Sequence, residues 1–136
     1  MDWKWFGRIG KITGNKAATM ELSTEEKKQY NRHLILDKIG EAGQLKLKAA
    51  KVLVIGAGGL SCPIIQYLSA AGVGHIGIID NDIVEQSNLQ RQILFTHDDI
   101  GQHKAQVAVE NMAKLNPYVH YDYYVQRLDS TNAIAL

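Results

Sequence analysis

The chain has 136 residues, 46% hydrophobic and 21% charged, and this length and composition predict a single globular domain with a substantial core. Its formal net charge of +1 at pH 7 excludes bulk attraction to nucleic acid or to an anionic membrane, so we expect neither as a partner. A single cysteine excludes an internal disulfide, and apolar runs shorter than the roughly 20 residues of a membrane span exclude a transmembrane protein, which together favour a cytoplasmic location.

Residues 1–19 form an amino-terminal extension rich in basic and aromatic residues. The segment holds four basic residues, one acid and both tryptophans, and Gly7, Gly10 and Gly14 interrupt any helix. A membrane-surface or targeting role is an alternative, but Asp2 and the glycines disfavour an amphipathic targeting helix. We therefore predict that this extension is flexible or loosely docked.

Helical signals begin after Met20. Ser23 and Glu26 form an S-x-x-E capping box, which is typical of a helix start. Four apolar residues at helical spacing follow and predict an amphipathic helix that ends at Gly40: Tyr30, Leu34, Ile35 and Ile39. A second short helix is expected over about residues 42–50.

The segment 51–80 reads KVLVIGAGGLSCPIIQYLSAAGVGHIGIID and predicts a strand, a glycine turn, a helix and a second strand. The run Val52–Ile55 is short, β-branched and uninterrupted, which is typical of a central parallel strand covered on both faces. Asp80 lies 24 residues after Gly56, close to the spacing at which a carboxylate reaches a ribose hydroxyl. Three glycines let the backbone approach a phosphate at the positive end of the helix: Gly56, Gly58 and Gly59.

The remaining residues predict a second crossover helix and a third strand. Residues 81–95 form a polar loop with a short helical turn, residues 101–115 show helical periodicity, and Tyr121–Val125 reads as a strand. With right-handed crossovers these pieces give an α/β fold, the first βαβαβ half of a Rossmann-like parallel sheet with strand order three, two, one. Strand one would then lie at an edge, where an apolar strand invites pairing, so we expect something to cover it and the chain to be part of a larger domain.

Polar residues beyond the glycine turn indicate which nucleotide is bound. A dehydrogenase needs little positive charge beyond its pyrophosphate turn, whereas a reaction at a triphosphate must neutralise charge that develops at the α-phosphorus. Arg91 can grip two phosphate oxygens and Lys104 supplies a compact charge, so the pair favours a triphosphate. Five residues follow the carboxyl end of a predicted strand and are expected to converge on one crevice: Asp80, Asp82, Asn88, Arg91 and Lys104.

Each of these residues also has an ordinary structural interpretation. Lys104 can be a solvated helix lysine, Arg91 a structural ion-pair partner, and Asn88 a cap of the short helix after Ser87. The aspartates can shape the loop, and the glycines can serve close packing. Cys62 is interpreted as a small buried filler and not a nucleophile. The histidines show no metal-ligand spacing, so we predict no metal-binding residues among them: His33, His75, His97, His103 and His120.

Three segments carry a dense signature: YNRHLIL, GAGGLSCPIIQYLSAAGVGHIGIIDNDIVEQSNLQRQ and GQHKAQVAVENMAKLNP. The glycine turn alone is weak evidence, but D-x-D followed by S-N-L-Q-R-Q and then G-x-x-K is seldom found in other Rossmann-like proteins. With this signature, residues 20–136 resemble the N-terminal part of the ATP-binding adenylation domain of the ThiF, MoeB and HesA family, relatives of the ubiquitin-activating enzymes. The resemblance implies ATP-dependent adenylation of the C-terminal carboxylate of a small ubiquitin-like protein, often a sulfur carrier ending in Gly-Gly, as in thiamine or molybdopterin biosynthesis.

The resemblance also implies a role for each matching residue. It places the three glycines against the nucleotide phosphates, Asp80 on the ribose, and four side chains along the phosphates: Asp82, Asn88, Arg91 and Lys104. Arg91, Lys104 and Arg32 are then the expected catalytic residues, with Arg32 reaching the active site of the neighbouring subunit of a homodimer. An ordinary surface or dimer contact is the alternative for Arg32, because no neighbouring residue in the sequence places it near phosphate. ATP and Mg²⁺ are the implied cofactors, and the substrate carboxylate is itself the nucleophile.

The sequence departs from the family pattern at several points. Ser61 stands where a third glycine is usual and Pro63 follows it, so we expect altered packing without loss of binding, because proline is tolerated in the first turn of a helix. The aspartate that relatives use for magnesium, their paired zinc cysteines and their acceptor cysteine would lie beyond Leu136. We therefore expect an incomplete catalytic site and little adenylation activity from these 136 residues alone.

Two other classes of function stay open. An NAD(P)-dependent Rossmann oxidoreductase accounts for the glycine turn and Asp80 but not for Arg91 and Lys104. A non-catalytic dimeric binding domain would keep the contact with the ubiquitin-like protein without the chemistry.

Overall fold

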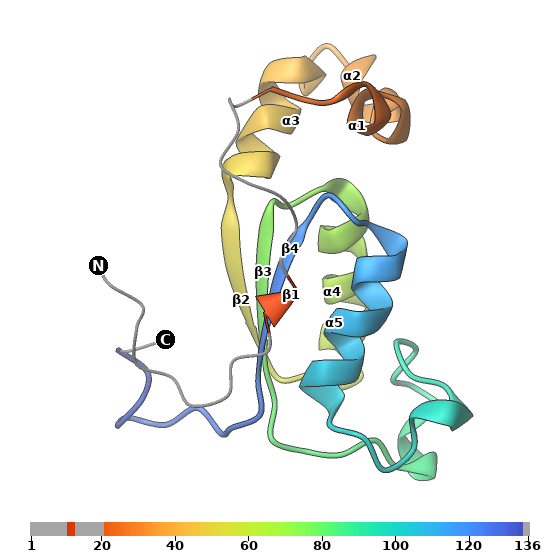
Figure 1. Ribbon diagram of the computed structural model, residues 1–136, viewed down its shortest axis with the longest axis vertical. Helices are drawn as coiled ribbons and strands as arrows, with labels where there is room; N and C mark the ends of the chain where they lie inside the picture. The colour runs from red at the N-terminus through yellow and green to blue at the C-terminus, as the bar shows by residue number, and fades with distance from the viewer. Residues whose placement is uncertain (1–10, 13–20, 135–136) are drawn as a thin grey trace.

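The computed structural model describes residues 11–12 and 21–134, and its order of elements is shown in Figure 1. The strands are β1 (Lys11–Ile12), β2 (Lys51–Ile55), β3 (His75–Ile79) and β4 (His120–Tyr124). The α-helices are α1 (Thr24–Gln29), α2 (Asn31–Leu34), α3 (Gly40–Ala49), α4 (Ser61–Ala71) and α5 (Lys104–Leu115). Two short 3-10 helices, η1 (Gln86–Asn88) and η2 (His97–Asp99), lie between β3 and α5.

The four strands form one sheet in the order β1-β4-β3-β2. Strands β2, β3 and β4 are parallel, and β1 pairs antiparallel with β4. The predicted Rossmann-like fold, with strand order three, two, one, is therefore confirmed. Helices α4 and α5 both cover the same face of the sheet (Figure 1). Because β2 and β3 are parallel, the loops that follow them begin at the same edge of the sheet.

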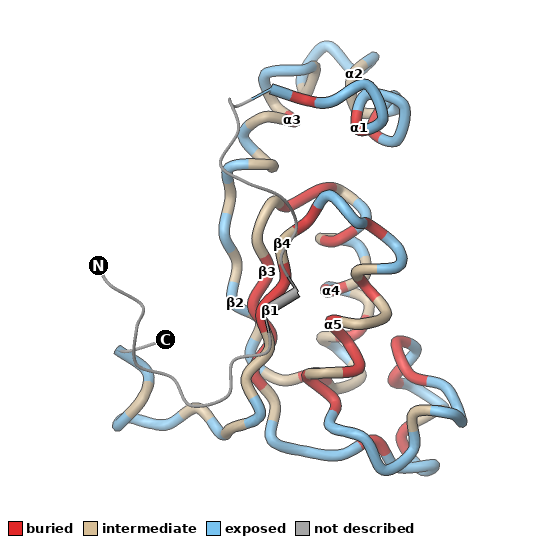
Figure 2. The backbone as a smooth tube through the Cα atoms, viewed as in Figure 1, coloured by how far each residue is buried: buried red, intermediate tan, exposed pale blue. Residues whose placement is uncertain are grey.

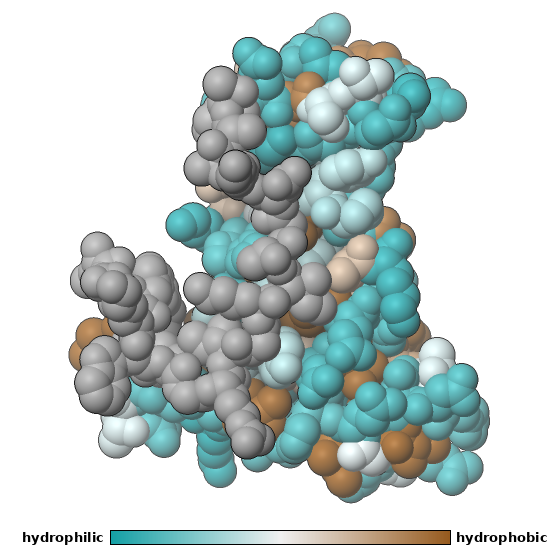
Figure 3. Space-filling view, viewed as in Figure 1, coloured by the Kyte–Doolittle hydropathy of each residue, from teal (hydrophilic) through white to brown (hydrophobic). Residues whose placement is uncertain are grey.

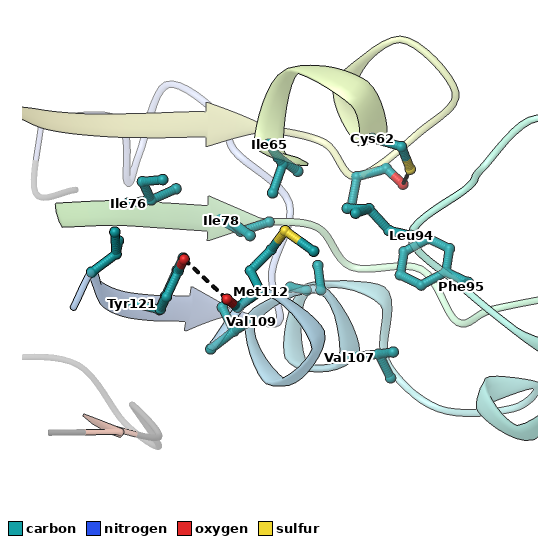
Figure 4. Packing of buried hydrophobic residues seen from close by; sticks show 14 of the residues in the cluster. Cys62, Ile65, Ile76, Ile78, Leu94, Phe95, Val107, Val109, Met112 and Tyr121 are labelled. Atoms are coloured by element: carbon teal, nitrogen blue, oxygen red, sulfur yellow. Dashed lines mark hydrogen bonds between the residues drawn. The ribbon is translucent and has the colours of Figure 1, made fainter. Parts of the chain in front are cut away.

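The core fills the space between this face of the sheet and the two helices (Figure 4). Ile76, Ile78 and Tyr121 from the sheet are each at most 1% exposed. The Tyr121 hydroxyl donates a hydrogen bond to the Met112 carbonyl oxygen at 3.2 Å, and burial raises its pKa to about 12. Helices α4 and α5 contribute the facing apolar side chains: Cys62, Ile65, Ala105, Ala108, Val109 and Met112.

Strand β2 is an edge strand with one open face, so the expectation that it is covered on both faces is wrong for the described residues. Val52 and Val54 pack against the core, whereas Leu53 is 38% exposed and Ile55 61% exposed. Figure 2 shows this alternation along β2. The reason is that both crossover helices lie on one side, so only alternate residues of the edge strand reach the core.

The predicted capping box at the start of α1 is confirmed. Ser23 Oγ accepts a hydrogen bond from the Glu26 amide at 3.1 Å, and Glu26 Oε2 accepts one from the Ser23 amide at 2.8 Å. Lys48 of α3 also pairs with the Glu26 carboxylate at 2.8 Å. This arrangement fastens the N-terminal helices to one another.

The expectation of one continuous helix up to Gly40 is wrong, because the chain breaks into α1 and α2 at Tyr30. Tyr30 is 4% exposed, and its hydroxyl accepts a hydrogen bond at 2.7 Å from Asn116 Nδ2, 86 residues along the chain. This hydrogen bond holds the Tyr30 ring against the end of α5, and α1 ends there. The second predicted helix, about 42–50, corresponds to α3.

Most of the amino-terminal extension lies outside the described residues. Within it, Lys11–Ile12 form β1, and the prediction that residues 1–19 are flexible stays a prediction. Among the residues that the structure describes, no helix is long and apolar enough to cross a membrane. On the face seen in Figure 3, hydrophobic residues lie in separate small patches among hydrophilic ones.

Candidate functional site

A pocket of about 630 Å³ lies where the carboxyl ends of β2 and β3 meet the start of α5. Its lining comes from the turn after β2, the loop after β3 and the first residue of α5. The lining residues are Gly56, Gly58, Gly59, Leu60, Ser61, Asp80, Asp82, Ile83, Glu85, Asn88, Arg91, Gln92 and Lys104. All eight residues that the sequence analysis assigned to nucleotide binding are among them, although they extend from Gly56 to Lys104.

The glycine turn forms one wall of the pocket. Gly56 has φ +86°, a left-handed conformation that favours glycine, and its amide donates to the Ile79 carbonyl oxygen at 2.7 Å. A Cβ atom on Gly58 would meet nothing within 4 Å, so a ligand can approach this backbone. A Cβ on Gly59 would lie 3.2 Å from Arg91 Cγ, so the missing side chain lets the stem of Arg91 lie against the turn.

Asp80 fixes the shape of the pocket through two backbone hydrogen bonds. Its Oδ2 accepts from the Ala57 amide at 2.7 Å, and its Oδ1 accepts from the Asp82 amide at 2.7 Å. The carboxylate therefore joins the glycine turn to the loop after β3. Asp80 therefore shapes the loop, and because each carboxylate oxygen has a second lone pair, a ligand hydroxyl can still bind.

Lys104 is buried at the first position of α5. Its side chain is only 7% exposed, and Nζ donates to Asp82 Oδ2 at 3.1 Å. Its backbone amide donates to the Asp82 carbonyl oxygen at 3.0 Å, which fixes the start of the helix against the loop. The solvated-lysine interpretation is therefore wrong, because the ammonium lies inside the pocket wall with an exposed carboxylate as its partner.

Asn88 is the last residue of η1, and Arg91 lies in the loop after it. Arg91 Nη1 donates to the Ser87 carbonyl oxygen at 3.1 Å, and the side chain makes no ion pair among the described residues. Asn88 is 7% exposed, and its Oδ1 accepts from the Glu85 amide at 3.3 Å. Asn88 thus caps the short helix, as its structural interpretation predicts, and also lines the pocket. Only one hydrogen bond from the Arg91 guanidinium is seen among the described residues, so most of its five N–H donors can bind a ligand.

Sequence reasoning missed several polar residues of the pocket wall, including Glu85 and Gln92. Gln92 is 4% exposed and lines the pocket, and its Oε1 has no hydrogen-bond partner among the described residues. The signal in the sequence is its place directly after Arg91 in Q-R-Q. A buried carbonyl oxygen without a partner is costly, so a ligand donor at this point would stabilise the site.

The third expected catalytic residue, Arg32, lies elsewhere. It is an exposed residue of α2, which packs with α1 and α3 at the amino end of the sheet, opposite the loops that form the pocket (Figure 1). It does not line the pocket of its own chain. Its assignment to a neighbouring subunit stays a prediction.

Cys62 behaves as the predicted buried filler. It is fully buried on α4, and its thiol donates to the Ala57 carbonyl oxygen at 3.6 Å. Burial raises the pKa of this thiol, which disfavours the nucleophilic thiolate.

Comparison with known proteins identifies the family. The ThiF family model matches residues 30–136, which is most of the chain. The chain belongs to the ThiF family. The resemblance noted from the sequence signature is thereby confirmed.

Curated relatives of this ThiF-family chain are considerably longer. It is 48% identical over 117 residues to the Sulfur carrier protein adenylyltransferase of Thermus thermophilus, covering 86% of this chain and 43% of the relative. It is 51% identical over 113 residues to the Adenylyltransferase and sulfurtransferase UBA4 of Saccharomyces cerevisiae, covering 82% of this chain and 26% of the relative. The chain therefore spans less than half the length of these relatives.

Solved structures share the same fold. One is E. coli tRNA N6-threonylcarbamoyladenosine dehydratase, TcdA, in complex with ATP, with a TM-score of 0.76, 27% identity, and coverage of 81% of this chain and 44% of that one. Another is E. coli MccB with MccA-N7isoASN, with a TM-score of 0.70, 33% identity, and coverage of 78% and 32%. ATP is thus a bound ligand in one structural neighbour of this ThiF-family chain.

Proposed function

We propose that this chain is the N-terminal part of an enzyme that uses ATP to adenylate the C-terminal carboxylate of a small ubiquitin-like sulfur-carrier protein ending in Gly-Gly. The observation that carries the proposal is the convergence of Arg91 and Lys104, from two separate segments, on the glycine turn. The names of the T. thermophilus and yeast relatives, which are adenylyltransferases, support the reaction class.

The pocket residues divide into those that hold ATP and those that stabilise charge. The backbone of Gly58, near the positive end of α4, lies open to phosphate oxygens, and Asp80 offers a lone pair to a ribose hydroxyl. A carboxylate oxygen of the carrier protein attacks the α-phosphorus, the bond to the β-phosphate breaks, and pyrophosphate leaves. Arg91 and Lys104 stabilise the negative charge that develops on the phosphoryl oxygens and the leaving group.

Charge balance in the pocket favours ATP bound with Mg²⁺. Three carboxylates line the pocket beside its two cations, so an uncomplexed triphosphate would meet repulsion: Asp80, Asp82 and Glu85. Mg²⁺ is usually held by one or two carboxylates together with phosphate oxygens. Asp82 fits that role best, because its side chain is 63% exposed whereas both oxygens of Asp80 accept backbone hydrogen bonds. The ion would supply neutralisation of phosphate charge.

The oxidoreductase alternative explains less of this pocket. A nicotinamide dinucleotide needs the glycine turn and Asp80, but it leaves the buried ammonium of Lys104 and the guanidinium of Arg91 without a function. A binding domain without catalysis would tolerate loss of either cation. Both alternatives therefore predict that replacing Arg91 leaves the affinity for ATP unchanged.

The test is binding of Mg²⁺-ATP and of NADH to the purified chain by isothermal titration calorimetry. The unmodified chain is expected to bind Mg²⁺-ATP and not NADH. Arg91→Ala is expected to weaken ATP binding by about tenfold or more, because hydrogen bonds to charged groups contribute about 1.5–3 kcal/mol. Arg127→Ala, which removes an exposed arginine outside the pocket, is the matched control and should bind ATP normally.

The chemical step is assayed in a protein that also carries the part of the domain present in the longer relatives. Exchange of pyrophosphate into ATP should require a carrier protein with its terminal Gly-Gly. Preference for NADH over ATP would instead support the oxidoreductase, and ATP binding unchanged by Arg91→Ala would remove Arg91 from the site.

We further propose that the enzyme is a homodimer in which each site takes Arg32 from the neighbouring subunit. The exposed position of Arg32 far from its own pocket supports this arrangement. Chains with Arg32→Ala and chains with Lys104→Ala should each be inactive in pyrophosphate exchange, and mixing them should restore part of the activity. A mixture of the two variants that shows no pyrophosphate exchange would place Arg32 outside the neighbouring site.

A further inference from the structure

Two histidines and an aspartate gather at the other end of the sheet from the ATP pocket. His75 is the first residue of β3, His120 is the first residue of β4, and Asp122 lies two residues further along β4. One potential ligand atom from each, two imidazole nitrogens and a carboxylate oxygen, lie within 4.8 Å of one another. This is the one such group of three that the described part of the chain contains.

Strand register explains why these residues meet. His75 and His120 are directly paired between the parallel strands β3 and β4, and Gly77 is paired with Asp122. Side chains two residues apart on a strand point to the same face, so Asp122 lies on the face that carries His120. Adjacent strands of a sheet hold these positions rigidly, and Gly77 has no side chain beyond hydrogen to crowd Asp122.

Both imidazoles present the same nitrogen to one carboxylate. His75 Nε2 lies 2.8 Å from Asp122 Oδ2, and His120 Nε2 lies 3.4 Å from Asp122 Oδ1. The two rings meet edge to face, with centroids 4.4 Å apart and an interplanar angle of 77°. Both Nε2 atoms therefore lie beside the same carboxylate.

These distances suit a tetrahedral metal ion. Zinc binds histidine nitrogen and carboxylate oxygen at about 2.0–2.2 Å, which places neighbouring ligand atoms of a tetrahedron about 3.4 Å apart. The contact between His120 Nε2 and Asp122 Oδ1 already has that length. His75 Nε2 instead contacts the other carboxylate oxygen, Oδ2, at 2.8 Å, and one ligand atom from each of the three residues lies within 4.8 Å of the others.

Asp122 supplies an independent observation. It is 9% exposed, and its Oδ1 accepts no hydrogen bond among the described residues; its contact with His120 Nε2, at 3.4 Å, is an ion-pair contact only. Buried carboxylate oxygens normally accept hydrogen bonds or coordinate metals, because an unsatisfied buried anion is costly. A metal ion between the two imidazoles would satisfy this oxygen.

Other charges near the cluster do not prevent binding. Two lysines are paired in register with the cluster: Lys51 of β2 with His75, and Lys11 of β1 with Asp122. Lys51 is exposed, so water and salt screen its ammonium. The cluster lies at the amino ends of the strands, whereas the ATP pocket lies at their carboxyl ends. The two sites therefore share no residue.

We propose that His75, His120 and Asp122 bind a divalent transition-metal ion of the Zn²⁺ type. Imidazole and carboxylate are ligands that such ions accept, and three protein ligands leave one position of the tetrahedron for water or another group. Bound metal would join β3 to β4 at the start of the parallel pair and stabilise the folded state by mass action.

The test is titration of the untagged 136-residue chain with Zn²⁺ after removal of metal by a chelator. Isothermal titration calorimetry should give one ion per chain, and the melting temperature should rise with Zn²⁺ concentration. His75→Ala and His120→Ala should each weaken binding at least tenfold, and Asp122→Asn should weaken it as well. His97→Ala, which removes an exposed histidine outside the cluster, is the matched control and should bind as the unmodified chain does.

A second measurement needs no variant. Co²⁺ added to the unmodified chain should give the intense visible absorption of a four-coordinate site, and Zn²⁺ should abolish it. Absence of that absorption overturns the proposal, even if a histidine variant fails to fold. Zn²⁺ binding that is unchanged in both histidine variants, with circular dichroism showing them folded, also overturns it. Mg²⁺-ATP affinity should be the same with and without Zn²⁺, so failure here is distinct from failure of the adenylation proposal.

Discussion

Replacement of Lys104 by methionine separates the structural contribution of this residue from its proposed role in ATP binding. Methionine keeps an unbranched stem of similar length in the buried channel, where only 7% of the lysine side chain is exposed, and removes the ammonium. The partner left behind, Asp82, is 63% exposed, so its carboxylate remains solvated. The free energy of unfolding should therefore change by no more than about 1 kcal/mol, the scale of a solvent-exposed ion pair.

The effect on ATP should be much larger. A hydrogen bond to a charged group contributes about 1.5–3 kcal/mol, so loss of the ammonium should weaken Mg²⁺-ATP binding by about tenfold to a hundredfold. Adenosine has no phosphate, so its affinity should be the same for both chains. Lys114→Met, in the last turn of the same helix, removes an exposed lysine and should leave the ATP affinity unchanged.

Calorimetric titrations with Mg²⁺-ATP, AMP and adenosine, together with thermal melts of each variant, measure both quantities. Equal ATP affinities of Lys104→Met and the unmodified chain would refute the reasoning, because the buried ammonium would then serve only the loop. A similar loss for adenosine and ATP would also refute it, because the change would then act through pocket shape and not through phosphate charge.

Two further predictions concern stability. Gly74→Ala should lower the free energy of unfolding by about 1–3 kcal/mol or more, because its Cβ would lie 1.7 Å from the Lys48 carbonyl oxygen. Gly58→Ala should leave the free energy of unfolding nearly unchanged in a urea melt, because a Cβ there would meet nothing within 4 Å. Burial alone would raise the pKa of Glu26, but hydrogen bonds from Lys48 and Ser23 outweigh it and hold the pKa below its ordinary value of 4.5. A carboxylate with a lowered pKa stabilises the fold above about pH 4.5, and this contribution is lost as the pH falls through the folded-state value. Glu26→Gln should therefore flatten the acid side of the stability profile.

Outcomes that contradict these two predictions are equally definite. Equal melts of Gly74→Ala and Gly58→Ala would show that the end of α3 yields to the added carbon atom. For the acid profile, the exposed Glu25→Gln is the control, and it should keep the pH dependence of the unmodified chain. Parallel profiles for Glu26→Gln and the unmodified chain would show that other carboxylates govern acid unfolding.

The pocket at the carboxyl ends of β2 and β3 was predictable from sequence because its signals are local. Parallel strands end at a common edge, so residues that follow Ile55 and Ile79 had to meet once the two strands were recognised. Lys104 could be placed by the same logic as the start of the next helix. Gln92 was missed because glutamine carries no charge pattern, and only its burial in the folded chain shows that its oxygen lacks a partner.

The errors come from contacts that local patterns do not contain. The break at Tyr30 depends on Asn116, a partner 86 residues away, so helical periodicity alone ran on to Gly40. The open face of β2 depends on which side both crossover helices take, and an apolar run is silent about that. The prediction of no metal-binding histidines stays untested, but local spacing could not show that His75 and His120, 45 positions apart, are neighbours, because only the register of β3 against β4 brings them together.

The two hydrogen bonds of Asp80 bear on how a nucleotide enters the site. Because this one carboxylate fastens the glycine turn and the loop after β3 together without help from any ligand, the hollow is already assembled when the chain folds. An incoming molecule then has little backbone to immobilise, and less of its interaction energy is consumed in ordering the protein. We therefore expect a nucleotide to bind to a preformed site. Its association rate constant should be set by diffusion and charge and not by loop closure.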